Sequence, residues 1–218
     1  MSISTPKNTE ELSDITIRFA GDSGDGMQLT GNQFTDNTAI FGNDLSTFPD
    51  FPAEIRAPAG SLAGVSSFQL QFSSDDIHTP GDDLDVLVAM NPAALKVHLK
   101  NLKENGILVV NEANFTKKNL GLAGWDENPL DNDTLRAYRL IREDMSKLVG
   151  LAVEDMGLSP KIISRSTNMF ALGLVYWLYE RNYDTTVNFL KEKFAKRPEL
   201  VEANVKALKA GFNYGETL

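Results

Sequence analysis

Residues 14–31 are the most informative about the fold and have the sequence Asp14-Ile15-Thr16-Ile17-Arg18-Phe19-Ala20-Gly21-Asp22-Ser23-Gly24-Asp25-Gly26-Met27-Gln28-Leu29-Thr30-Gly31. Alternating apolar residues over about 14–20 predict a β-strand. The glycines and aspartates of 21–26 predict a loop, and apolar residues at near-helical spacing predict a helix over 27–41. This stretch is therefore a strand, a glycine loop and a helix in succession.

The same unit type recurs along the chain, so strands alternate with helices. Besides the first strand, alternation or apolar runs predict strands at 68–72, 84–90, 106–110 and 138–142. Helices are predicted at 92–103, 160–182, 185–196 and 198–210, and prolines make 48–60 an extended loop. The fold class predicted is α/β: a Rossmann-like, mostly parallel sheet with helices on both faces and a C-terminal helical segment. We expect a flexible tail at 1–13, one domain at 14–210 and the start of a linker at 211–218.

Composition narrows the possible functions. The chain has 218 residues, 42% of them hydrophobic, which suits one packed domain. It has no cysteine, so disulfides, thiolate zinc sites and Cys-ligated iron–sulfur clusters are impossible within it. The net charge of −9 argues against general nucleic-acid binding. We find neither a membrane span nor a signal peptide and expect a cytoplasmic protein.

The glycine loop is the strongest chemical feature, and several interpretations of it remain open. Backbone N–H groups at the helix start could bind a polar or anionic group of a cofactor. The loop could equally be a tight turn, with Asp22 and Asp25 as solvated turn residues without a role. We expect Gly24 and Gly26 to adopt backbone conformations that other residues avoid. The glycine spacing matches neither the dinucleotide fingerprint nor a P-loop.

Two catalytic interpretations of the same loop are weaker. Ser23 does not lie in a nucleophile elbow, because position 25 is Asp, and neither His78 nor His98 stands in a recognisable motif. Gly24-Asp25-Gly26 could begin a thiamine diphosphate motif, but residues 50–58 lack the asparagine that would complete its Mg²⁺ site. We therefore predict no catalytic residue and no metal ligand in this chain.

The 18–31 stretch resembles the opening of the gamma domain of 2-oxoacid:ferredoxin oxidoreductases, which have a loop of the type G-x-x-G-x-G-x-x-x-x-G. Gly21, Gly24, Gly26 and Gly31 occupy those positions. The acidic loop followed by Gln-Leu-Thr-Gly is similar to the 2-oxoglutarate type, in which gamma and alpha domains are fused. Further similar blocks follow in the family's order, namely Glu54-Ile55-Arg56, the strand ending in Asn91, and Asn168 with the helix after it. Where the family often has Gly-Gly after the arginine, this chain has Ala57-Pro58.

The resemblance implies a non-redox domain that helps to hold coenzyme A and to assemble the active site of a hetero-oligomeric enzyme converting a 2-oxoacid, such as 2-oxoglutarate, to an acyl-CoA and CO₂. Thiamine diphosphate, Mg²⁺ and iron–sulfur clusters are then expected only in partner alpha and beta domains or subunits, with ferredoxin as electron acceptor. The predicted cofactor-contacting residues are Gly21, Asp22, Ser23, Gly24, Asp25, Gly26, Met27, Gln28, Glu54, Arg56 and Asn91.

Simpler interpretations remain for these residues and for the whole chain. Glu54 and Arg56 could form only a mutual ion pair, Asn91 could only cap the following helix, and Asn168 could be a cap or a core hydrogen-bonding residue. The chain itself could be an unrelated Rossmann-type small-molecule binding module or a purely structural interaction domain.

Overall fold

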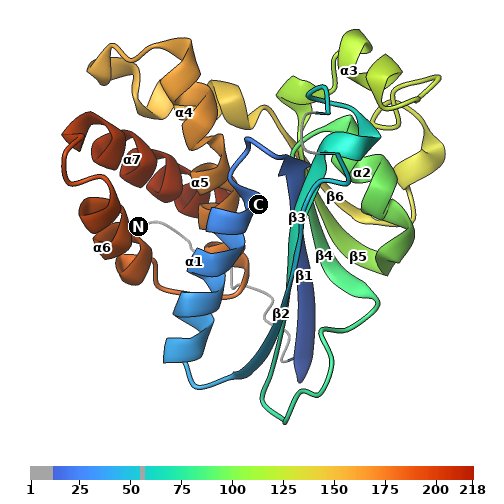
Figure 1. Cartoon of the computed structure of the whole chain (residues 1–218), viewed down its shortest axis with the longest axis horizontal. Coiled ribbons are helices and arrows are strands. Elements are labelled where there is room, and N and C mark those ends of the chain that lie inside the picture. Colours follow the sequence, from blue (N-terminus) through green and yellow to red (C-terminus); the bar gives the residue numbers. More distant parts are fainter. Residues whose placement is uncertain (1–11, 55–56) are drawn as a thin grey trace, which may run out of the picture.

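The computed structural model describes residues 12–54 and 57–218 and contains one six-stranded sheet in the order β2-β3-β1-β4-β5-β6 (Figure 1). The strands are β1 (Asp14–Asp22), β2 (Asp44–Asp50), β3 (Val65–Ser73), β4 (Leu84–Ala89), β5 (Leu102–Asn111) and β6 (Arg139–Glu143). The pairs β1–β4, β4–β5 and β5–β6 are parallel, whereas β3 is antiparallel to both β1 and β2. The predicted mostly parallel α/β sheet is thus confirmed.

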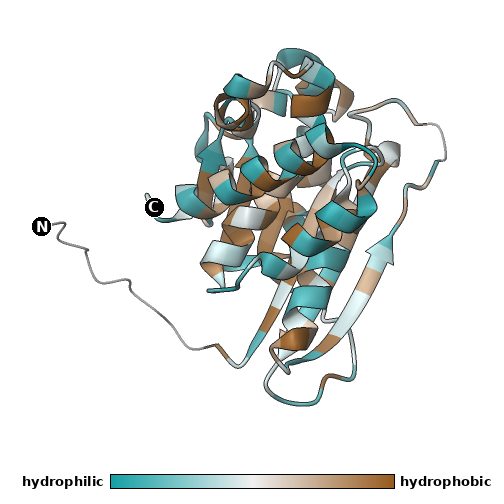
Figure 2. Cartoon of the chain, turned by 90° about the vertical axis from the view of Figure 1, so that its left-hand side faces the viewer, coloured by the Kyte–Doolittle hydropathy of each residue, from teal (hydrophilic) through white to brown (hydrophobic). Residues whose placement is uncertain are grey.

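Helices cover both faces of this sheet (Figure 1). One face carries α1 (Met27–Ile40), α4 (Met145–Ala152), α5 (Pro160–Leu178), α6 (Asp184–Lys193) and α7 (Pro198–Gly215). The other face carries the short helices α2 (Pro92–His98) and α3 (Lys117–Leu122). In Figure 2, which looks onto the five-helix side, hydrophilic and hydrophobic residues alternate along the outer helices, as amphipathic helices require.

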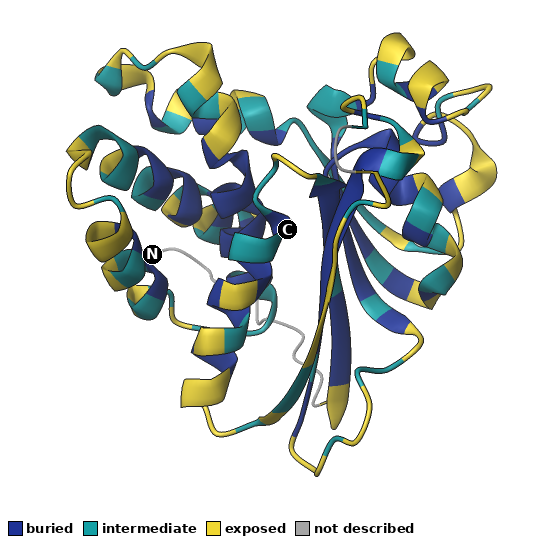
Figure 3. Cartoon of the chain, viewed as in Figure 1, coloured by how far each residue is buried: buried dark blue, intermediate teal, exposed yellow. Residues whose placement is uncertain are grey.

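The core is divided between the two faces of the sheet. Large aromatic side chains fill the five-helix side, where Phe34 of α1 stacks on Tyr176 of α5 with ring centroids 5.6 Å apart. The burial colours of Figure 3 show β1 and the inner turns of α5 as mainly buried. Because β1 is central and buried on both faces, the loop that follows it is attached to a strand that is packed into the core.

Several element boundaries differ from the sequence prediction. The predicted loop at 48–60 begins with the end of an unpredicted edge strand, β2, where Pro49 is tolerated because only one side of the strand is paired. Helix α2 ends at His98, earlier than predicted, and β5 begins already at Leu102. Helix α4 was not predicted, and α7 continues to Gly215, so residues 211–215 are helical where we expected a linker.

The two histidines of the chain differ in their surroundings. His98 is buried, and its Nδ1 lies 2.8 Å from an Nη atom of Arg18. Burial and the charges of Arg18 and Lys100 lower the pKa of His98 to about 4, so the imidazole is neutral at pH 7. Arg18 also donates to Gln69, whose own amide donates to the carbonyls of Pro80 and Gly81. His98 therefore belongs to a structural polar network on the α2 side of the sheet.

Candidate functional site

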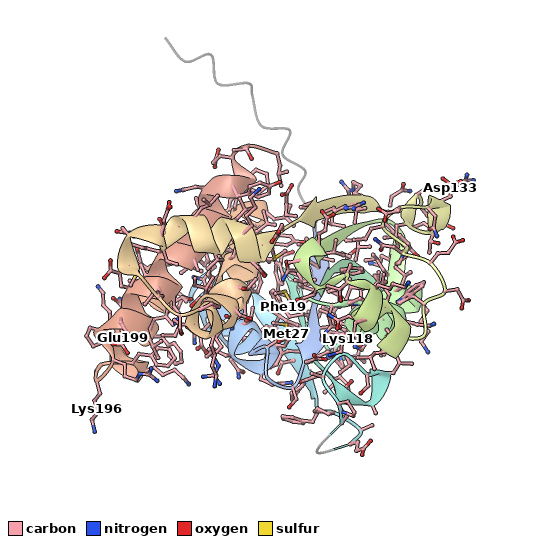
Figure 4. All side chains as sticks on the ribbon, turned by 90° about the horizontal axis from the view of Figure 1, so that it is seen from above. Phe19, Met27, Lys118, Asp133, Lys196 and Glu199 are labelled. Carbon is pink, nitrogen blue, oxygen red and sulfur yellow. The ribbon has the colours of Figure 1, made fainter. Side chains whose placement is uncertain are left out.

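The glycine loop lies at the carboxyl end of the parallel strands, between β1 and the start of α1. Viewed from this end, Phe19 of β1 and Met27 at the start of α1 lie near the middle of the molecule, whereas Asp133 and Lys196 mark opposite rims (Figure 4). The N–H of Met90, just after β4, donates to Ala20 at the end of β1 (2.9 Å). Open α/β sheets bind ligands at this edge, so the loop occupies the expected position for a site.

The two glycines that we expected to be conformationally special differ. Gly26 has φ +76°, in the left-handed region that favours glycine, and a Cβ there would lie 2.6 Å from Nδ2 of Asn168. Gly24 is exposed, its φ is outside that region, and a Cβ would have nothing within 4 Å. The prediction is confirmed for Gly26 and wrong for Gly24, because the sharp reversal into α1 takes place at a single residue.

The carboxylates of both loop aspartates accept hydrogen bonds from backbone N–H groups. Asp22 accepts the N–H of Gly60 with both carboxylate oxygens, at 2.9 and 3.1 Å, which holds the segment after β2 against the glycine loop. Asp25 Oδ2 accepts the N–H of Asp22 at 2.8 Å. The interpretation of these acids as solvated turn residues without a role is therefore wrong, since each one fixes the backbone.

Burial changes the protonation of both acids. Burial raises the pKa of Asp25 to about 6; the Asp22 N–H opposes the rise and the Asp22 carboxylate adds to it. Burial also raises the pKa of Asp22. The N–H of Gly60 and the amide of Asn91 oppose this rise. At pH 7 the Asp25 carboxylate is mainly ionised, and it can take up a proton just below the physiological range.

The remaining predicted residues near the loop are held by the protein itself. Met27 is buried in the core beneath α1. Gln28 is half-buried, and its Nε2 donates to the carbonyl of Ser67 at 2.8 Å, which fastens α1 to β3. Ser23 is exposed and donates its N–H to the Gly64 carbonyl, whereas Glu54 lies exposed at the end of the segment that Asp22 holds. Arg56 lies outside the described residues, and so does its expected pairing with Glu54.

Asn91 caps helix α2, which is the simpler of the two interpretations given above. Its Oδ1 accepts the N–H of Ala94 at 2.8 Å and so caps α2, with Pro92 in the first turn. The side chain is only 3% exposed, and Nδ2 has no hydrogen bond of normal geometry within the described residues. Contact between Asn91 and a ligand remains a prediction.

A cavity opens beside the loop, under Gly24 and Asp25. Its other walls come from the ends of β4 and β5 and from α4 and α5: Met90, Asn111, Asn114, Ser146, Ser164, Arg165, Thr167 and Asn168. Asn168 is not a helix cap, as one interpretation had it, because it lies well inside α5 and faces Gly26. Of the ten predicted cofactor-contacting residues that the structure describes, only Gly24 and Asp25 line this cavity.

The sequence analysis missed most of these walls. Asn111 terminates β5 just as Asn91 follows β4, so the rule that nominated Asn91 could have found it. Apart from Asn168, which the family resemblance had named, the α4 and α5 residues had no such signal, because the packing of α4 and α5 brings them to the loop. Within residues 12–54 and 57–218, no group of three or more His, Asp or Glu side chains could hold a metal ion.

With the site in place, the chain can be compared with known proteins. The profile of the pyruvate ferredoxin/flavodoxin oxidoreductase family matches residues 16–214. This chain belongs to that family. Across residues 12–54 and 57–218, no helix is long and apolar enough to cross a membrane.

Individual relatives fall within the same family. The chain is 55% identical over 208 residues to the 2-oxoglutarate oxidoreductase subunit KorA of Mycobacterium tuberculosis, covering 95% of this chain and 32% of KorA. It superimposes with a TM-score of 0.72 and 26% identity on the 2-oxoglutarate:ferredoxin oxidoreductase of Magnetococcus marinus, solved with 2-oxoglutarate, coenzyme A and succinyl-CoA bound. That match covers 95% of this chain and 32% of the neighbour, so the chain spans about a third of both proteins.

A smaller protein shares the whole fold. The gamma subunit of a keto/oxoacid ferredoxin oxidoreductase from Geobacter sulfurreducens matches with a TM-score of 0.61 and 21% identity. The match covers 94% of this chain and 99% of that subunit. The family member described here therefore has the fold of a complete gamma subunit.

Proposed function

We propose that this chain is the gamma-type, non-redox part of a 2-oxoglutarate:ferredoxin oxidoreductase that forms succinyl-CoA and CO₂. The observation that carries the proposal is the 55% identity to a 2-oxoglutarate oxidoreductase subunit over 95% of the chain. The neighbour from Magnetococcus marinus, which holds 2-oxoglutarate, coenzyme A and succinyl-CoA, supports the same substrate. The cytoplasmic location expected from the sequence is a further part of the proposal.

Within such an enzyme, the chain would help to bind coenzyme A. The start of α1 offers first-turn N–H groups that have no partner within the helix, and the cavity beside it offers side-chain amides and hydroxyls. Coenzyme A brings the thiol that accepts the acyl group, and this chain's residues would bind and orient it. Thiamine diphosphate, Mg²⁺ and iron–sulfur clusters would be held by partner alpha and beta domains, because no cysteine is available here as a cluster ligand.

The test compares the chain alone with the complete enzyme. The chain, purified anaerobically, should be colourless and unable to reduce a viologen dye with 2-oxoglutarate and coenzyme A. The enzyme assembled with its partner domains should reduce the dye only when both substrates are present, and should prefer 2-oxoglutarate to pyruvate. Turnover by the isolated chain would refute the division of roles, and preference for pyruvate would refute the substrate.

Calorimetry separates this proposal from the two alternatives. The assembled enzyme should bind coenzyme A and should not bind NAD(P). Binding of NAD(P) in place of coenzyme A would favour a Rossmann-type module of another function. Coenzyme A binding that is unchanged by every substitution around the glycine loop would favour a purely structural domain.

A further inference from the structure

The cavity beside the glycine loop is lined mainly by uncharged groups that form hydrogen bonds. Six of its ten lining residues carry an amide or a hydroxyl: Asn111, Asn114, Ser146, Ser164, Thr167 and Asn168. Among the residues that the structure describes, the charged members of the lining are Asp25 and Arg165; they have opposite signs, and Arg165 is exposed. A phosphate site is normally dominated by cations, so this lining suits an uncharged ligand with several donors and acceptors.

Asn168 shows most directly that the cavity is built for a polar partner. Its side chain is only 5% exposed, yet Oδ1 finds no hydrogen-bond partner within residues 12–54 and 57–218. A buried amide oxygen without a partner is costly, and native proteins rarely keep one unless a ligand or an ordered water satisfies it. The Nδ2 group of the same side chain faces Gly26, where α1 begins, and the residue lines the cavity together with Asp25.

The charges around the start of α1 oppose a phosphate there. A helix N-terminus carries a charge equivalent to about +0.5, whereas the ionised carboxylate of Asp25 places a negative charge in the loop that precedes the helix. Asp25 is held by the N–H of Asp22, and the Asp22 carboxyl group is held by the N–H of Gly60, so neither side chain is free to swing away from a ligand. These acidic groups therefore disfavour a phosphate beside the start of α1.

We propose that this cavity binds the uncharged amide- and hydroxyl-bearing pantetheine arm of coenzyme A, and that the phosphates of the same molecule bind elsewhere. The inference rests on the proposed function, in which coenzyme A is a substrate. The amide N–H and hydroxyl groups of the arm donate to Asp25 and to Oδ1 of Asn168. Its amide carbonyls accept from hydroxyl groups of the cavity lining, those of Ser146 and Ser164. Asp25 retains acceptor capacity for this, because Oδ2 alone is engaged with the Asp22 N–H.

The experiment compares coenzyme A with pantetheine, which has the arm and no phosphate. Calorimetric dissociation constants for both are measured on the complete enzyme carrying Asp25→Asn or Asn168→Ala. We expect each substitution to weaken both compounds by the same factor, on the order of tenfold for one lost hydrogen bond to a buried group. Asp133→Asn, the same chemical change at the exposed rim position seen in Figure 4, should leave both constants unchanged.

Salt dependence gives a second readout. If the phosphates bound at the loop instead, removing a negative charge with Asp25→Asn would tighten coenzyme A binding, leave pantetheine unaffected and alter the dependence of coenzyme A affinity on ionic strength. That outcome overturns the inference. Equal salt dependence in wild type and Asp25→Asn, together with parallel losses for both compounds, supports it.

Two further outcomes separate the inference from the proposed function. If the wild-type enzyme binds no coenzyme A, the proposed function fails, and the inference fails with it. If the wild type binds coenzyme A but neither variant weakens pantetheine, only the inference fails. Loss of assembly on gel filtration with unchanged affinity in the assembled fraction would assign the cavity to a partner segment, which also overturns it. Asp25→Asn, nearly isosteric, keeps the test valid if Asn168→Ala does not fold.

Discussion

Gly173 of α5 and Gly211 of α7 form a reciprocal backbone contact where these two helices pack on each other. A Cβ on Gly173 would overlap the carbonyl oxygen of Leu208, and a Cβ on Gly211 would overlap the carbonyl oxygen of Phe170. Neither carbonyl can yield as the end of a flexible side chain could. The C-terminal helix is therefore seated on α5 by two glycines from opposite sides of one interface.

This contact predicts that one added methyl group on either helix is destabilising. Gly173→Ala and Gly211→Ala should each lower the free energy of unfolding by about 1–3 kcal/mol or more, since the helices must separate. Gly150→Ala within α4, where a Cβ would meet nothing within 4 Å, is the control. It should stabilise by about 0.5–1 kcal/mol through helix propensity. Urea unfolding measures all three, and equal stability of the three variants would contradict the contact.

The glycine loop offers a second matched pair. Gly26→Ala must hold a non-glycine residue at φ +76° and displace Asn168, so we expect a loss of about 1–3 kcal/mol. Gly24→Ala, only two residues away, should change stability by less than about 0.5 kcal/mol. Thermal denaturation of both variants tests this. A Gly24 variant as unstable as the Gly26 variant would mean that the loop adopts another conformation.

Asp25 should make the stability of the chain fall as the pH rises through the acidic range. Because its pKa is raised to about 6 in the folded chain, the folded state holds a proton that the unfolded state releases near pH 4. The contribution of Asp25 to the free energy of unfolding is fully present below pH 4 and is lost by about pH 6. This change is on the order of 1–3 kcal/mol. The free energy of unfolding of Asp25→Asn, relative to that of wild type, should therefore increase as the pH rises from 4 to 7. A stability difference that stays constant over this range would contradict the burial of the carboxyl.

His98 should make the free energy of unfolding fall as the pH falls through the same range, the opposite of the effect of Asp25. Its pKa is lowered to about 4, mainly by burial and then by Arg18, so the unfolded state takes up a proton before the folded state does. Its contribution is complete above about pH 6.5 and is lost as the pH falls towards 4. The free energy of unfolding of His98→Gln, relative to that of wild type, should therefore increase by about 1–3 kcal/mol in total as the pH falls. Parallel stability curves of variant and wild type would show that His98 titrates normally.

Arg56 remains a predicted ligand or interface residue, and kinetics can decide its role. Prolines on both sides stiffen its segment, and an exposed ion pair with Glu54 alone would contribute only about 0–1 kcal/mol. If Arg56 makes a bidentate contact, Arg56→Lys should impair the enzyme almost as much as Arg56→Ala, because lysine lacks the planar fork. A raised KM for coenzyme A indicates ligand contact, and loss of assembly indicates a partner contact. Wild-type behaviour of both variants would exclude either role.

The elements that follow from local residue pattern could be predicted without the structure. Alternation in Ile15, Ile17 and Phe19 predicted β1, and the apolar run after Leu84 predicted β4, because burial on one or both faces leaves a periodic signature. The glycine loop and the start of α1 at Met27 were predicted for the same reason. Ordered motif blocks then indicated the family, which the profile match confirms.

The arrangement of the site depends on contacts between distant segments, which no local pattern indicated. β2 carries Pro49 and is exposed along most of its length, so no pattern distinguished it from a loop until β3 paired with it. Asn168 and Asp25 are more than 140 positions apart and meet only because α5 packs beside the start of α1. Likewise, nothing local showed that Asp22 would hold Gly60, or that Gly24 would be unconstrained while Gly26 was not. Hydrogen bonds and close approaches between distant segments depend on packing geometry, which local sequence pattern does not encode.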